Sequence, residues 1–375
     1  MKRTLWIVVA LAVILSLLTT GIALAAPAGT VTPRDDKAIS DKIVIKVTGL
    51  TPPAAGNVYV GWLVNSDGSK KVNTGVLTVA ADGSADMTYT SPTGENLVGL
   101  YSAFVITSEK DADKLAAAPK GSVILEAPGA PAQALAHIRH LDYQWASAPN
   151  QTGLAIGTLK QAQLASQHAN FALDALKAGD LATAKMHTEH VVNIIEGSKG
   201  PNFGDLNGDG KTENPGDGFG LLEYAKGTAQ HAGFAAGTPD ASANVKLHSP
   251  HVVDTANNVV TWATQARDKA LAVIKAPDAA TALPLATDMA RLTTLGLNGN
   301  STKPATGEGG ALTVWEHAQN MATFIVATTT PAPAPTAAAL PASGNRLPVE
   351  LLVLVAAGLL GLGIGLRRLA YVRNR

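Results

Sequence analysis

The segment HVVDTANNVVTWATQARDKALAVIK, residues 251–275, decides the fold class of the larger part of this chain. Its apolar residues Val252, Val259, Ala266 and Val273 recur at the spacing of one helical face, and polar or charged residues fill much of the remainder. A helix of this kind buries its apolar face against other helices, so the segment predicts one member of a bundle.

Ala-rich segments with the same periodicity lie on both sides of this one. Gly179-Asp180, Gly197 and Pro277 separate them as helix breakers. We therefore expect an α-helical bundle over residues 132–327. The expected helices cover residues 132–140, 154–177, 181–196, 221–236, 251–275, 279–295 and 312–327.

Residues 38–127 have the pattern of β-strands instead. β-Branched and aromatic residues alternate with polar ones, and residues 65–68 (NSDG) and 81–83 (ADG) supply turns. Short strands at this spacing predict a small antiparallel β-sandwich, and the breaker cluster at residues 128–131 (PGAP) predicts a boundary before the bundle. The strands are expected at residues 42–47, 58–64, 75–79, 85–89, 101–107 and 123–126.

The order of motifs in this sandwich resembles the extracytoplasmic C-terminal domain of anti-sigma-K factors. The resemblance rests on residues 58–64 (VYVGWLV), 74–79 (TGVLTV), 104–109 (FVITSE) and 119–125 (PKGSVIL), with DGS at 82–84. In that family a cytoplasmic sigma-binding domain and a membrane span precede the outer domain. The resemblance implies a sandwich on the outer face of the membrane. Such a domain would bind a partner, serve as a spacer, or regulate a separate anti-sigma protein.

The first 25 residues have the three-part plan of a secretory signal peptide. Lys2 and Arg3 precede an apolar run at 5–18, and small residues at 23–25 (ALA) fit a peptidase site. The sequence therefore predicts export, with the alternative that the segment stays as an uncleaved anchor.

The other end has the pattern of a membrane anchor. An apolar and glycine-rich run at residues 351–366 is followed by Arg367 and Arg368, which predicts a transmembrane helix with a basic tail within residues 347–375. Residues 328–346 are rich in Pro, Ala and Thr and predict an extended stalk. Within the stalk, residues 340–344 (LPASG) resemble the Leu-Pro-x-Thr-Gly sorting signal, which implies cell-wall attachment as an alternative to a plain anchor.

The fold class expected from these segments is multidomain: an antiparallel β-sandwich, then an α-helical bundle, then a C-terminal transmembrane helix. The protein is then extracytoplasmic and anchored to the cell membrane by its C-terminus. A net charge of zero argues against a nucleic-acid partner. The absence of cysteine from the sequence excludes disulfides and thiolate metal sites.

All nine histidines lie between positions 137 and 317, within the predicted bundle. Three His-x-x-His pairs, at 137/140, 187/190 and 248/251, place two imidazoles on one helical face, a spacing that transition metals can use. An outer acceptor such as Glu189 or Glu316 would orient them. The alternative is that the histidines hydrogen-bond across the core without a ligand. The candidates for a transition-metal or haem site are His168, His187, His190, His231 and His317.

The sequence DLNGDGKTE at residues 205–213 resembles the calcium loop of EF-hand and dockerin proteins. Oxygen ligands at alternate positions can converge on one hard cation, and Gly210 permits the bend. The twelfth position of the pattern is Gly216, where a bidentate acid belongs, so Glu213 or Asp217 has to compensate. The alternative is a pair of tight turns without a cation. The candidate calcium ligands within residues 205–217 are Asp205, Asn207, Asp209, Lys211 through its carbonyl, Glu213 and Asp217.

No nucleophile elbow, phosphate loop or dinucleotide fingerprint is present in the sequence, so we expect no enzymatic activity. The leading hypothesis is a noncatalytic, exported and membrane-tethered surface protein with a structural calcium site, which binds an envelope protein or cell-wall partner. One alternative is a transition-metal or haem carrier or sensor. The other is an extracytoplasmic regulator linked to anti-sigma signalling.

Overall fold

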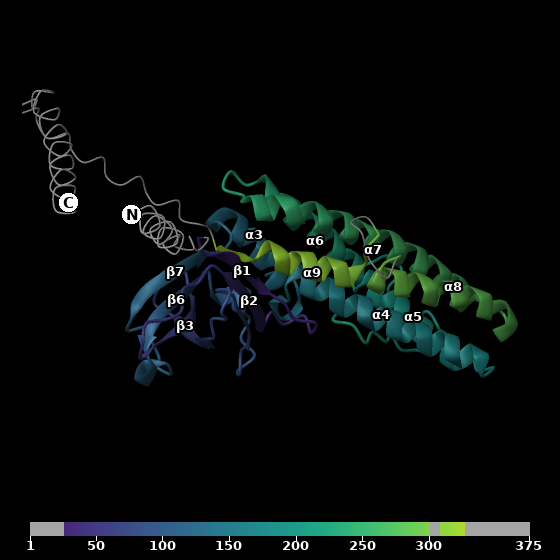
Figure 1. Cartoon of the computed structure of the whole chain (residues 1–375). Helices are drawn as coiled ribbons and strands as arrows, with labels where there is room; N and C mark the ends of the chain where they lie inside the picture. Colours follow the sequence, from purple (N-terminus) through teal and green to yellow (C-terminus); the bar gives the residue numbers. More distant parts are fainter. Residues whose placement is uncertain (1–25, 301–307, 327–375) are drawn as a thin grey trace, which may run out of the picture. The chain divides into compact units, whose positions relative to one another are not determined.

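The computed structural model describes residues 26–300 and 308–326, which belong to one compact unit (Figure 1). Strands and helices occupy separate parts of this unit. The strands build two four-stranded sheets, and the long helices pack beside them.

Both sheets are antiparallel throughout, and their apolar faces share one core. In β2 the side chains of Ile43, Ile45 and Val47 are buried while their neighbours are not, which is the alternation of a strand with one covered face. Phe104 and Ile106 of β6, from the other sheet, belong to the same hydrophobic cluster. The first sheet has the order β5 (Ala85–Thr90), β2 (Lys42–Thr48), β1 (Ala28–Pro33), β8 (Phe324–Val326), and the second has the order β4 (Lys71–Leu77), β3 (Asn57–Val64), β6 (Ala103–Lys110), β7 (Ser122–Pro128).

The expected succession of a sandwich and then a bundle is wrong. Strand β8 follows the last described helix and pairs with β1, so that Gly29 faces Val326 and Val31 faces Phe324. The long helices are thus inserted between β7 and β8, and the first sheet is completed by the two ends of the described chain. A three-residue strand has too few positions to reveal a period in the sequence, which is why β8 was missed.

The expected transmembrane helix is not supported either. Among the helices of residues 26–300 and 308–326, none is long and apolar enough to cross a membrane. The longest of them, α7 (Ala243–Lys275), buries one face and keeps charged residues such as Arg267 and Lys269 on the others. The segments 1–25, 328–346 and 347–375, for which a signal peptide, a stalk with its sorting motif and an anchor were predicted, lie outside the described residues.

The helical part has a core built mainly from alanine and medium-sized aliphatic residues. Small side chains let helix axes approach closely: at Gly157 of α4, the ring of Tyr224 from α6 fills the space that a Cβ atom would need. Besides α7 and the short α2 (Leu97–Leu100), the helices are α3 (Ala132–Asp142), α4 (Leu154–Lys177), α5 (Leu181–Glu196), α6 (Leu221–Gly237), α8 (Ala279–Asn298) and α9 (Ala311–Met321).

Helix α7 begins earlier than the sequence pattern predicts. The hydroxyl of Ser242 accepts a hydrogen bond from the backbone N–H of Val245, and this N-cap starts the helix at Ala243. The helix continues through Pro250, whose ring normally breaks a helix. As a result His248 and His251 lie on one continuous helix, three residues apart.

The sheets and the helices are joined by polar contacts around Asp35. The indole Nε1 of Trp315, in α9, donates to the carbonyl oxygen of Asp35 at 2.8 Å, and the backbone N–H of Asp35 donates to the Oε1 atom of Gln319 at 2.7 Å. Asp35 is 6% exposed, so these bonds lie at a covered junction. They fix the position of α9 beside β1 (Figure 1).

Candidate metal centres

The nine histidines lie in three separate groups of three. Each group takes a pair of histidines, three residues apart, from one helix and a single histidine from another helix. Within each group, one nitrogen of every imidazole lies within 4.8 Å of the others, close enough to hold a metal ion. The triads are site 1 (His137 and His140 of α3 with His231 of α6), site 2 (His187 and His190 of α5 with His168 of α4) and site 3 (His248 and His251 of α7 with His317 of α9).

The nitrogen that faces the centre of each triad is Nδ1. The Nδ1 atom of the single histidine lies 3.2 and 3.1 Å from the two Nδ1 atoms of its pair in site 1. The corresponding distances are 3.1 and 3.1 Å in site 2 and 3.0 and 3.2 Å in site 3. Three chemically identical atoms therefore converge in each triad.

The orientation of the rings is also repeated. The single histidine is tilted by 47°, 47° and 39° against the first ring of its pair in sites 1, 2 and 3. Against the second ring it stands nearly perpendicular, at 89°, 84° and 81°. Three sites on three different pairs of helices thus share one geometry, which is hard to explain by unrelated packing needs.

Hydrogen bonding does not account for this convergence. A neutral imidazole Nδ1 carries either one hydrogen or one lone pair, so it makes one good hydrogen bond along one direction. In every triad the Nδ1 atom of the single histidine faces two other Nδ1 atoms at hydrogen-bond distance. At least one of these two contacts lacks a satisfactory hydrogen bond, whereas three lone pairs can all be used by one central cation.

The electrostatics favour the neutral imidazoles that metal ligation requires. The pKa values of His168, His231 and His248, one from each site, are lowered to about 4, first by burial and then by the charges of the other histidines of the triad. The same causes lower the pKa values of His140 and His187. The lone pairs of these side chains are therefore free at neutral pH.

The distances match those of a metal with imidazole ligands. Zinc binds imidazole nitrogen at about 2.0–2.1 Å, so two such nitrogens lie roughly 2.9 Å apart at a right angle and roughly 3.4 Å apart at the tetrahedral angle. The contacts of 3.0–3.2 Å fall between these limits. With three protein ligands, each centre leaves a coordination position for water or another ligand.

Sites 1 and 2 share an aromatic neighbour, three residues after the single histidine. The ring of Phe234 lies 5.5 Å from the rings of His137 and His231, and Phe171 holds the corresponding place in site 2, at 5.2 Å from His187. The Trp145 ring packs against site 1 in addition. Aromatic rings therefore cover part of the imidazoles in both sites.

Site 3 has a polar neighbourhood instead. Asn320 stands where the other sites have phenylalanine, and its Oδ1 atom accepts from the Arg34 guanidinium at 2.9 Å. The same guanidinium forms an ion pair with Glu316, also at 2.9 Å. Site 3 therefore lies beside the junction between the helices and the sheets.

The outer acceptors differ from those expected. Glu316 pairs with Arg34, and Glu189 accepts backbone hydrogen bonds from Leu206 at 2.9 Å and from Glu213 at 2.8 Å. It is the carboxylate of Glu213 that reaches a ligand, with Oε2 at 3.2 Å from Nε2 of His190. Only Glu213 among these three carboxylates thus contacts a histidine of the triads in the described residues.

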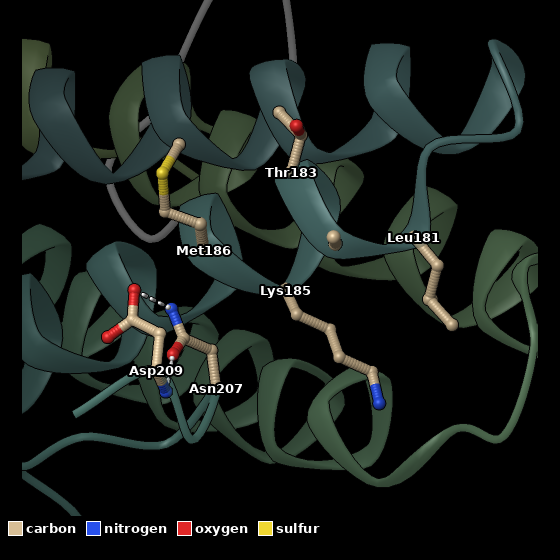
Figure 2. A pocket seen from close by; sticks show the side chains of 7 residues that line it. Leu181, Thr183, Lys185, Met186, Asn207 and Asp209 are labelled. Carbon is tan, nitrogen blue, oxygen red and sulfur yellow. Dashed lines mark hydrogen bonds between the residues drawn. The ribbon is translucent and has the colours of Figure 1, made fainter. Parts of the chain in front are cut away.

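The calcium-type loop wraps around Asp205. Its two carboxylate oxygens accept from the backbone N–H groups of Gly208 and Gly210, at 2.8 and 2.9 Å. Asn207 and Asp209 cap the following turns through their side chains and line an open cavity of about 590 Å³ at the start of α5 (Figure 2).

The remaining acidic candidates of the loop have other contacts. Glu213 contacts His190, and Asp217 accepts from the hydroxyl of Tyr224 at 2.7 Å. Among the described residues, the groups of three or more ligands close enough for a metal are the histidine triads, and they include no carboxylate of the loop. Calcium binding at the loop, with Lys211 as a carbonyl ligand, stays a prediction.

The structure distributes the five candidate histidines over all three sites. His168, His187 and His190 lie together as site 2, whereas His231 and His317 belong to sites 1 and 3. The four others complete these two sites, and their signal in the sequence was the repeated His-x-x-His spacing at 137/140 and 248/251.

Haem fits this geometry poorly. Two imidazoles that hold a haem iron approach it from opposite faces of a flat macrocycle. Here the Nδ1 atom of the single histidine lies only 3.0–3.2 Å from the Nδ1 atoms of both paired histidines, which leaves no room for a macrocycle between them. The triads therefore favour a transition-metal ion over haem.

Comparison of the chain with protein-family models, with curated proteins and with solved structures finds no match. The resemblances to the anti-sigma-K domain, the EF-hand loop and the sorting signal thus stay predictions. The assignment of a function rests on the geometry of the three triads.

Proposed function

We propose that this protein binds first-row transition-metal ions, one in each of three tris-imidazole sites. The observation that carries the proposal is the convergence of three Nδ1 atoms in each triad, repeated with the same ring orientations on three pairs of helices. Imidazole is a ligand of borderline character that suits zinc and copper. The sequence contains no cysteine, and no carboxylate of residues 26–300 and 308–326 belongs to a triad.

Metal binding is the activity that the triads themselves support, because each of them brings three imidazole nitrogens close enough together to hold one ion. A role in holding, buffering or delivering metal ions fits three similar sites in one chain.

The test is the metal content of the full chain, purified without a histidine tag and dialysed against zinc or copper(II). We expect three ions per chain. Replacing the single histidine of one site, as in His231→Gln, His168→Gln or His317→Gln, should remove one ion each time and leave two, because the remaining sites lie on other helices. Less than one ion per chain in the unmodified protein, or no loss in the three variants, would refute the proposal.

A further inference from the structure

Site 2 differs from the other sites in the second nitrogen of one ligand. Nε2 of His190 lies 3.2 Å from the carboxylate of Glu213, and the His190 side chain is 10% exposed. In the described residues, no hydrogen-bond partner faces Nε2 of His140 or His251, which hold the same position in sites 1 and 3. One ligand of site 2 therefore has an outer acceptor that its two counterparts lack.

The contact fixes the tautomer of His190. An ionised carboxylate can only accept, so Nε2 carries the hydrogen and donates it to Glu213. In a neutral imidazole the lone pair then lies on Nδ1, the atom that faces His168 at 3.1 Å. A carboxylate behind a ligating histidine also raises the basicity of the ligand and holds its ring in place.

Glu213 is itself held by the helix that carries the ligand. Its backbone N–H donates to Oε1 of Glu189 at 2.8 Å, and its carbonyl oxygen accepts from Nδ2 of Asn193 at 2.8 Å. Glu189 and Asn193 lie on α5, on either side of His190 in the sequence. The carboxylate is thus positioned relative to His190 by α5 and not by a distant part of the fold.

The rest of the loop is fastened to the same helix. Glu189, with 0% exposure, also accepts from the backbone N–H groups of Leu206 and Asn207 at 2.9 and 3.1 Å. The amide of Asn193 bonds the backbone of Gly204 through both its oxygen and its nitrogen, each at 3.0 Å. These bonds leave residues 204–213 little freedom to move Glu213 away from His190.

We infer that Glu213 is a positioning residue of site 2 and that site 2 consequently binds its metal ion more tightly than sites 1 and 3 and fills first. This inference rests on the proposed function, because it assigns an order to the three metal sites. The gain arises because His190 presents its lone pair to the ion in the metal-free protein, so that less reorganisation accompanies binding.

The affinity of site 2 is measured in the full chain after sites 1 and 3 have been removed by His231→Gln and His317→Gln. In this background we expect Glu213→Leu to weaken zinc binding by about 10–100-fold, the usual effect of losing such an acceptor. Glu213→Gln should stay within about threefold of the parent, because its amide oxygen can accept the same hydrogen bond. Asp205→Ala serves as the control that disturbs the loop but keeps Glu213.

The inference is overturned if Glu213→Leu binds zinc as the parent does, if Glu213→Gln loses as much affinity as Glu213→Leu, or if Asp205→Ala has the same effect. A second measurement needs no change at Glu213: the first equivalent of zinc added to the unmodified chain should shift the histidine NMR signals of site 2 before those of the other sites. Filling of site 1 or site 3 first would also overturn it. Failure of the proposed function is recognised separately, because no site would then bind zinc.

Discussion

His168, His231 and His248 belong to different sites, and each has a pKa lowered to about 4 from an ordinary value of 6.5. In the unfolded chain these imidazoles take up protons at the ordinary value, whereas in the metal-free fold they do so only near pH 4. Between pH 4 and pH 6.5 the unfolded chain therefore binds more protons than the fold does. The contribution of these histidines to the free energy of unfolding is complete above pH 6.5 and is lost as the pH falls from 6.5 toward 4.

We therefore expect the melting temperature of the metal-free protein to fall when the pH is lowered through this window. The triple variant His168→Gln, His231→Gln and His248→Gln should show a smaller fall, because glutamine does not titrate. Thermal unfolding followed by circular dichroism, with a chelator present, measures both curves. Parallel curves for the two chains would show that these histidines do not carry the effect.

The buried carboxylate of Asp142, at the end of α3, is the basis of a second prediction at the residue scale. Its carboxylate oxygens are buried and have no hydrogen-bond partner among the described residues, and burial, together with the charge of Asp35, raises its pKa well above 3.8. A carboxyl group whose pKa is raised by folding stabilises the fold at a pH below its pKa in the unfolded chain. That contribution is lost as the pH rises through its pKa in the folded protein. At neutral pH the fold therefore carries the cost of an unpaired buried acid.

Asp142→Asn should remove that cost and stabilise the protein at pH 7 by about 1–3 kcal/mol, since a neutral amide is less costly to bury than a carboxylate. The gain should disappear at acidic pH, where Asp142 is protonated. Urea unfolding at both pH values measures the difference. A variant that is destabilised at neutral pH would indicate that the carboxylate has a partner in the folded protein.

At the scale of elements, the periodic segments could be predicted and the irregular ones could not. The apolar stripe of residues 251–275 predicts the main part of α7, but not its start at Ala243, which lies on the other side of Pro250, a residue type that normally breaks a helix. Strands β1 and β8 lie outside the range predicted for the sandwich. β1 contains Gly29 and ends at Pro33, residues that weaken a strand pattern.

The loop after α5 gives the prediction at this scale. Asp205→Ala removes the acceptor of two backbone hydrogen bonds, from Gly208 and Gly210, and should lower the free energy of unfolding by about 1–2 kcal/mol with or without calcium. If the loop also binds calcium, the ion should raise the melting temperature of the parent and not that of the variant. An unchanged stability of the variant in the absence of calcium would contradict the structural role of Asp205.

At the scale of the whole molecule, the sites depend on contacts between distant segments. The His-x-x-His pairs are visible in the sequence, because three residues bring two side chains to one helical face. Their third ligands cannot be recognised in this way. His231, for example, lies 94 residues after His137 and 91 residues after His140, the two histidines that it joins. Only the packing of α6 against α3 decides that His231 completes site 1.

Site 3 connects metal binding to the closure of the whole fold. Its ion would hold α9, through His317, against α7, and α9 leads directly to β8, which completes the first sheet beside β1. We therefore expect metal binding to slow hydrogen exchange at the backbone amides of Phe324–Val326 and of the facing residues of β1. The expected effect is a lower population of the state in which β8 has detached.

The matched control is His317→Gln, which keeps sites 1 and 2. Ions in those sites still stabilise the fold as a whole, by about 2.7 kcal/mol per site at a concentration one hundred times the dissociation constant. The variant therefore separates the local effect on β8 from global stabilisation. Hydrogen exchange measured by mass spectrometry should show metal-dependent protection of β8 in the parent beyond that in His317→Gln. Equal protection of β8 in both chains would mean that site 3 stabilises the helices without holding the sheet closed.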